Sequence, residues 1–224
     1  MDQVGDFGPI YTETNLAQFP VEPFNTFSNL FFLIVIIYWF KKRKSIGDKN
    51  FKVFLNICLP ILLVGYIGGT IYHATRSHSL WLILDFVPIF VLAIIVSLYM
   101  WKKIVQSYLL IFAFMVGLIV IPRSILLYFF YESPYKITLG YVLLSVPILI
   151  PTFIHESKRQ WLGKRDLFLT LACLVVAISF RALDSSHFVQ SFVPMGTHWL
   201  WHSFGGVTTH LLLIYIYKNT IGLD

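Results

Sequence analysis

The sequence has few charged residues. Of its 224 residues, only 12% are Asp, Glu, Lys or Arg, whereas 57% are hydrophobic and the mean hydropathy is +0.74. A soluble domain of this composition would have too few polar side chains to cover its apolar surface. The shortage of charge therefore argues against a soluble protein and predicts an all-α integral membrane protein that crosses the bilayer several times.

Cysteine and acidic residues are also scarce. The two cysteines, Cys58 and Cys173, both lie inside apolar runs, which is typical of small packing residues and predicts neither a disulfide framework nor a cysteine metal site. The 11 acidic residues are outnumbered by 17 basic ones. The basic residues lie in short segments between apolar runs, a distribution typical of membrane proteins, so nucleic acid is not an expected partner. Membrane lipids are expected partners, and the sequence predicts no protein partner.

Apolar runs occupy most of the chain. A transmembrane helix needs roughly 20 apolar residues, and seven runs approach this length. We expect one domain over residues 1–224, in which a seven-helix transmembrane bundle follows an outer segment, 1–24. The seven runs are 25–40, 52–73, 80–101, 104–121, 137–155, 166–183 and 197–217. A fourth run that continues past Pro122 to Tyr131 stays open as an alternative.

Basic residues are distributed unequally between the two sides that seven spans would define. Thirteen fall on one side and four on the other. The thirteen are Lys41, Lys42, Arg43, Lys44, Lys49, Lys52, Lys102, Lys103, Lys158, Arg159, Lys164, Arg165 and Lys218, and the four are Arg76, Arg123, Lys136 and Arg181. Because Lys and Arg concentrate in cytoplasmic loops, this bias predicts an N-terminus that is outside or lumenal and a cytoplasmic C-terminus. The expected location is a bacterial inner membrane or, in a eukaryote, a membrane of the ER or Golgi type.

Two histidines lie four residues apart in the stretch GTHWLWHSFGG (196–206), at the start of the seventh run. Residues at i and i+4 share one helix face, so His198 and His202 predict a metal-binding pair. His73, at the end of the second run, has the same predicted depth, and Asp85 in the third run lies close to it. Three protein ligands with one water are typical of a catalytic zinc site.

Further polar residues share this outer level. Thr70, three residues before His73, is predicted to project its hydroxyl towards the metal. Asp85 is expected to contact the metal-bound water or to orient a ligand. Ionisable groups inside spans are functional candidates by default. The supporting residues that we expect near the site are Ser28, Asn29, Arg181 and Asp184.

The histidine pair has other interpretations. The two imidazoles could be hydrogen-bonded packing residues, or they could ligate haem, which is held between axial histidines on different helices. A transporter is disfavoured, because the polar residues gather on one side and do not mark a path through the midplane.

Four stretches together resemble the alkaline ceramidase family, part of a wider superfamily of seven-helix membrane hydrolases that includes the adiponectin receptors. They are EPFNTFSNLFFLI (22–34), GGTIYHATRSHSLWLILDFVPI (68–89), FRALD (180–184) and GTHWLWHSFGG (196–206). The resemblance covers most of the chain in order. It implies a zinc-dependent amidase that cleaves the N-acyl bond of ceramide, or of a related lipid amide, to a fatty acid and a sphingoid base.

The resemblance also implies roles for individual residues. The zinc ligands would be His73, His198 and His202, and the catalytic aspartate would be Asp85. Family members bind calcium through an acidic N-terminal segment, and the residues that match it here are Glu13, Asn15 and Glu22.

The chain departs from the family pattern in three places. Gly69 stands where the family usually has a serine, one turn before the first zinc histidine, with Thr70 beside it. The spacing from His73 to Asp85 is one residue longer than in the animal enzymes, and the calcium segment is shorter, with Ile10 near the place of its leading acid. These departures leave open a rival function, a non-catalytic zinc-bearing receptor or lipid-binding protein.

Overall fold

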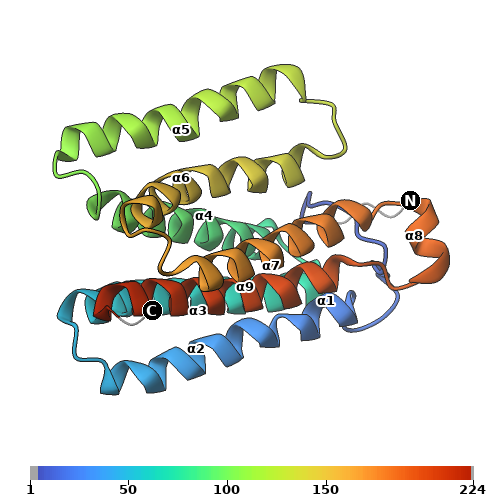
Figure 1. The fold of residues 1–224 in the computed structure, drawn as a ribbon. Coiled ribbons are helices and arrows are strands. Elements are labelled where there is room, and N and C mark those ends of the chain that lie inside the picture. Colours follow the sequence, from blue (N-terminus) through green and yellow to red (C-terminus); the bar gives the residue numbers. More distant parts are fainter. Residues whose placement is uncertain (1–4, 223–224) are drawn as a thin grey trace. The chain divides into compact units, whose positions relative to one another are not determined.

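The computed structural model describes residues 5–222, so residues 1–4 of the predicted outer segment and the last two residues lie outside the description. The described residues are helical or irregular and form no β-strand. The helices in chain order are α1 (Pro23–Ser28), α2 (Leu30–Lys42), α3 (Lys49–Thr75), α4 (Ser79–Lys102), α5 (Tyr108–Phe129), α6 (Lys136–Lys158), α7 (Lys164–Leu183), α8 (His187–Phe192) and α9 (His198–Ile221), with a 3₁₀ turn η1 (Arg43–Ser45) after α2 (Figure 1).

Six helical segments are long and apolar enough to cross a membrane, by length and composition. They are Pro23–Ser45, Lys49–Thr75, Ser79–Lys102, Tyr108–Phe129, Lys136–Lys158 and Lys164–Leu183. Together with the absence of strands among the described residues, these segments confirm the prediction of an all-α protein and are consistent with a multi-pass integral membrane protein. The helix α9 has 24 residues, but its histidines, threonines and glycines lower its hydropathy, and it is not among the six.

The helix bounds lie within a few residues of the predicted runs, except for the fourth. The helix α5 begins at Tyr108 rather than at 104 and ends at Phe129 rather than at 121. Ser107 explains the late start, because its side chain accepts the backbone N–H of Leu110 and caps the helix. The helix also continues through Pro122, as in the longer alternative for this run.

The chain divides into two compact units, one made of Met1–Ile89 with Arg165–Asp224 and the other of Phe90–Lys164. The expectation of one domain stays a prediction. The first unit contains all the candidate site residues. Within it, α3 and α9 each pack against α1 and α2. Glycine allows close approach in two places: a Cβ at Gly206 would be too close to Phe31 of α2, and a Cβ at Gly68 would overlap Leu84 of α4.

The second unit contains the end of α4 with α5 and α6, and α5 and α6 run side by side (Figure 1). Pro151 has no amide hydrogen, so the carbonyl of Pro147, four residues earlier, lacks its helical donor. The Ser97 hydroxyl of α4 supplies a donor, with Oγ 2.6 Å from that carbonyl oxygen. A core of Trp101, Ile111 and Met115 completes this unit.

Candidate metal centre

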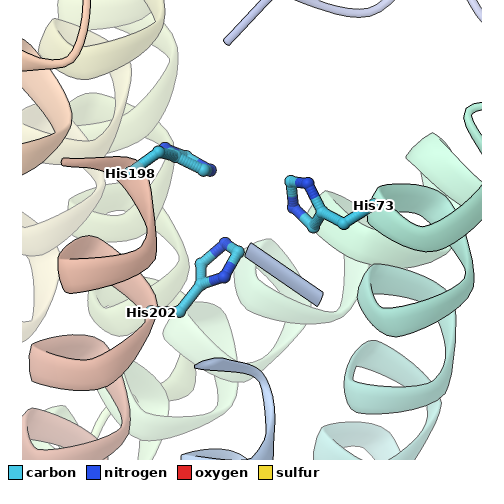
Figure 2. A group of neighbouring side chains, drawn as sticks. All are labelled: His73, His198 and His202. Atoms are coloured by element: carbon cyan, nitrogen blue, oxygen red, sulfur yellow. The ribbon is translucent and has the colours of Figure 1, made fainter. Parts of the chain in front are cut away.

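Three histidines meet between the end of α3 and the start of α9. His73 comes from the last turn of α3, and His198 and His202 come from the first two turns of α9, with their rings turned towards one another (Figure 2). One ring nitrogen from each lies within 4.8 Å of the other two, and all three residues are buried. Among the described residues, this is the one group of three or more His, Cys, Asp or Glu side chains that converges in this way. The prediction that these three come together is confirmed.

Asp184 determines where α9 begins. Its Oδ1 accepts the backbone N–H groups of Thr197 at 2.7 Å and His198 at 2.9 Å, which are free donors at the start of a helix. Its Oδ2 accepts the N–H of Thr12 at 3.2 Å, so the same carboxylate also binds the N-terminal segment. Gly196 precedes the helix at φ 71°, where a Cβ would overlap Asp184. Asp184 therefore supports the site by positioning the backbone of His198.

Glu22 orients the ring of His73. Its Oε2 lies 2.5 Å from His73 Nδ1, and both side chains are fully buried. Its Oε1 accepts from the Thr14 hydroxyl at 2.6 Å and pairs with the guanidinium of Arg76. Burial raises the pKa of the Glu22 carboxyl group, but its hydrogen bond to His73 and the charge of Arg76 outweigh burial and hold that pKa below its usual value. A charged carboxylate therefore accepts the Nδ1–H of His73.

A buried ion pair with Asp6 continues this chain of contacts. Arg76 Nε and Nη2 lie 2.7 and 3.0 Å from the two oxygens of Asp6, a bidentate pair. The pairing with Asp6 and Glu22 raises the pKa of Arg76 against the opposing effect of burial. Arg76 ends α3 in the left-handed conformation, φ 47°. The contacts Asp6–Arg76–Glu22–His73 thus link the N-terminal segment to the histidine centre.

The other two histidines have partners at Nδ1 as well. His202 Nδ1 lies 2.9 Å from the Ser28 hydroxyl and 3.1 Å from the backbone carbonyl of Asn25. His198 Nδ1 lies 3.4 Å from Arg181 Nη1, and its ring stacks on Tyr11 with centroids 3.9 Å apart. Ser28 and Arg181, expected as supporting residues, therefore contact the two histidines of α9.

These partners determine which nitrogens a cation would meet. A carboxylate and a carbonyl only accept, so Nδ1 of His73 and of His202 carries the proton and Nε2 offers its lone pair. Nε2 of His73 is buried and has no hydrogen-bond partner among the described residues. His198 differs, because a guanidinium only donates. If His198 binds a cation through Nε2, its proton moves to Nδ1 and the Arg181 contact lengthens. With that adjustment, three neutral imidazoles fit a divalent metal such as zinc.

Asp85 and Asn29 approach Gly69 rather than the histidine nitrogens. A Cβ at Gly69 would overlap Oδ1 of Asp85 and lie 3.4 Å from Oδ1 of Asn29. Asp85 is not a member of the converging group, although its charge interacts with His73 and Arg181. The Asn29 amide donates to the Asn25 carbonyl at 3.2 Å, and the Thr70 hydroxyl donates to the carbonyl of Tyr66 at 2.6 Å.

The three residues matched to a calcium site have separate protein partners. Glu13 accepts the backbone N–H groups of Phe24 at 2.9 Å and Asn25 at 2.6 Å, and burial raises the pKa of its carboxyl group despite these bonds. Asn15 accepts the N–H of Ala17. Glu22 contacts His73, Arg76 and Thr14, as described above. Calcium binding stays a prediction, and in this arrangement the guanidinium of Arg76 neutralises the Glu22 carboxylate.

The comparisons with known proteins add no relative. No protein-family model matches this sequence, and none of the curated proteins matches it. The geometry of the histidine centre is therefore the main support for a function.

Proposed function

We propose that this protein is a zinc-dependent membrane hydrolase that cleaves the amide bond of ceramide or a related N-acyl lipid. One observation carries the proposal: three buried histidines from two helices converge on one point, each with a partner at Nδ1. Acceptors such as the Glu22 carboxylate at His73 and the Asn25 carbonyl at His202 raise ligand basicity and orient the rings in metalloenzymes. The resemblance to the alkaline ceramidases supports the substrate class.

The proposal includes a seventh span and an orientation. The helix α9 comes after the apolar helix α7 and the short helix α8, and it is as long as the spanning helices. Its histidines face protein partners rather than lipid, which removes the main obstacle to placing it in a bilayer. With seven spans, the unequal distribution of basic residues places the N-terminus and the histidine centre on the outer or lumenal side. A lipid amide could reach this level with its headgroup at the interface and its chains between helices or in the bilayer.

The proposed reaction adds water across the amide bond. His73, His198 and His202 would hold the zinc ion, which when bound would act as a Lewis acid and lower the pKa of a water molecule to about 7. Asp85 accepts the proton of the attacking water and delivers it to the leaving amide nitrogen, so that an acid and an amine are released. The Thr70 hydroxyl donates a hydrogen bond to the Tyr66 carbonyl. To stabilise the oxyanion, it would have to break that bond and donate to the substrate instead.

A non-catalytic lipid-binding or receptor-like protein is the second candidate. Two observations favour it: Gly69 offers no hydroxyl, and Asp85 lies outside the converging group. Such a protein would bind zinc and retain lipid without releasing product. Turnover therefore separates the two functions.

The metal claim is tested by the zinc content of purified wild type and His202→Ala. We expect about one zinc per chain in wild type and little in the variant. His210→Ala is the matched control, because His210 lies on the same helix and contacts Trp39 rather than the centre. Full zinc in His202→Ala would refute the ligand assignment. An absorbance spectrum without a Soret band excludes haem.

The chemistry is tested by fatty acid release from a C18 ceramide in mixed micelles. Wild type should release fatty acid, whereas Asp85→Ala should lose at least about 100-fold of that activity while it keeps its zinc. Zinc-loaded wild type that binds the lipid without releasing product would support the non-catalytic candidate instead.

A further inference from the structure

The N-terminal segment contains a loop, residues 7–20, that is tied at both ends to the end of α3. On one side of the loop, Asp6 makes its bidentate ion pair with Arg76. On the other side, the backbone N–H of Val21 donates to the carbonyl of Ala74 at 2.9 Å. Surface loops whose two ends lie close together are compact units that frequently have a function. We call this loop the strap.

The middle of the strap crosses to the other side of the metal centre. Tyr11 stacks on His198 of α9 with ring centroids 3.9 Å apart, and its centroid lies 5.4 Å from that of His73. The Thr12 hydroxyl donates to the backbone carbonyl of Asp184 at 2.5 Å. The strap therefore connects the end of α3 to the start of α9. These are the same two helices that the three histidines would join through a cation.

The strap helps to close the centre to water. The three histidines are 4% exposed or less, and Tyr11, which lies against two of their rings, is 9% exposed. The ring nitrogen of His73 that a cation would meet, Nε2, is buried. A cation therefore reaches this nitrogen from water only when part of the surrounding structure moves.

The strap is the part of this enclosure that opens most readily. The helices α3 and α9 pack against α1 and α2, and Gly206 of α9 leaves no room for a Cβ beside Phe31. The strap has no helix of its own, and its residues 15–19 are exposed. Segments with few buried contacts open locally more often than packed helices do. Its ties to α3 can stay in place while Tyr11 and Thr12 move away from the centre.

We propose that the strap is the gate of the metal centre. A cation enters and leaves only while Tyr11 and Thr12 are released from His198 and Asp184, and a bound cation holds the strap in place. The second part follows because cation and strap join the same two helices, so that each stabilises the arrangement that the other needs, and such coupling is reciprocal. The inference rests on the proposed function, since it concerns the loading of the same metal site.

The test measures zinc exchange in purified wild type, Thr12→Val and Gln18→Ala, with Zn²⁺ alone as the probe. Valine keeps the volume of threonine but removes the hydrogen bond to the Asp184 carbonyl and the one received from Gln190 Nε2 at 3.1 Å. Gln18 is the matched control, because it is an exposed residue of the strap whose amide donates to the Val21 carbonyl. Stopped-flow mixing with a chromophoric chelator gives the rate of release, and mixing of the apo protein with Zn²⁺ gives the rate of uptake.

We expect Thr12→Val to release and to take up zinc about fivefold to tenfold faster than wild type, since the lost hydrogen bonds stabilise the closed strap. Its Kd should stay within about twofold of wild type, because the strap is weakened equally with and without zinc. Gln18→Ala should match wild type in both rates. As a second measurement, the backbone N–H groups of residues 11–14 in wild type should exchange with deuterium at least about tenfold more slowly when zinc is bound.

Three outcomes would overturn the proposal. Unchanged rates in Thr12→Val would show that zinc exchanges by another route. Faster release with a proportionally higher Kd would make Thr12 a support of the ligands and not part of a gate. Equal deuterium exchange with and without zinc would refute the link between cation and strap. All three leave the proposed function intact, because wild type holds zinc in each of them, whereas wild type without zinc would refute the function and this inference together.

Discussion

Replacing Glu22 by glutamine should weaken zinc binding at the histidine centre. Glu22 is fully buried, and its two oxygens serve different partners, His73 Nδ1 on one side and Arg76 with Thr14 on the other. Both main partners are donors. Glutamine keeps the volume but has one carbonyl oxygen and one NH₂ group, so that either His73 or Arg76 must face a donor. The carboxylate therefore cannot be replaced without loss at one of the two contacts.

The expected loss of zinc affinity follows from the role of Glu22 as the hydrogen-bond partner of the proposed zinc ligand His73. Changing such a partner typically lowers metal affinity by about 10- to 100-fold, which corresponds to roughly 1.4–2.7 kcal/mol. The assay is a competition titration of the purified protein against a chromophoric zinc chelator, with the thermal unfolding temperature measured in parallel. A dissociation constant unchanged from wild type would refute the proposal that Glu22 orients His73 for a metal.

Thr14→Val is the matched control. It removes the 2.6 Å hydrogen bond from the Thr14 hydroxyl to the same carboxylate but leaves its charge and its contact with His73 in place. We expect this variant to bind zinc within about threefold of wild type, since the lost bond is made to Oε1, whereas His73 contacts Oε2 and Arg76 still pairs with the carboxylate. If both variants lose zinc equally, the effect of Glu22→Gln is a general loss of packing.

Two further predictions concern the approach of α4 and the start of α9. Gly69→Ser should displace the Asp85 carboxylate and lower lipid amide hydrolysis at least about tenfold while zinc content stays constant; equal or higher activity in the micelle assay would contradict this. Asp184→Ala leaves the N–H groups of Thr197 and His198 without their acceptor, so we expect a destabilisation of about 0.5–2 kcal/mol, seen as a lower unfolding temperature in detergent, and weaker zinc binding. An unchanged unfolding temperature would show that the cap is dispensable.

The sequence predicts the histidine centre well because local geometry carries most of it. His198 and His202 share a helix face by their spacing alone, and the order of apolar runs places the end of the second run at the same level. His73 could then be matched to them by depth. The identity of the metal is a different matter, because three imidazoles suit several divalent ions.

The buried ion pair behind the centre was not predicted. Asp6 and Arg76 are 70 residues apart, and no periodicity relates them. The available signal was indirect: Arg76 is one of only four basic residues on the predicted outer side, and it follows an apolar run that ends in a candidate ligand. Tyr11 and Asn25 were also missed, since an aromatic ring and a backbone carbonyl have no distinguishing sequence pattern.

Two of the three places where the chain departs from the pattern it resembles, Gly69 and the stretch that ends at Asp85, meet in the structure. His73 lies in the last turn of α3 and Asp85 lies in α4, so the stretch that separates them includes the connection between the two helices, residues 76–78. In this arrangement, Asp85 Oδ1 occupies the space that a Cβ at position 69 would need, with Asn29 Oδ1 close by. A serine at 69 would have to displace this carboxylate. Glycine at 69 is therefore what leaves room for the Asp85 carboxylate in this arrangement.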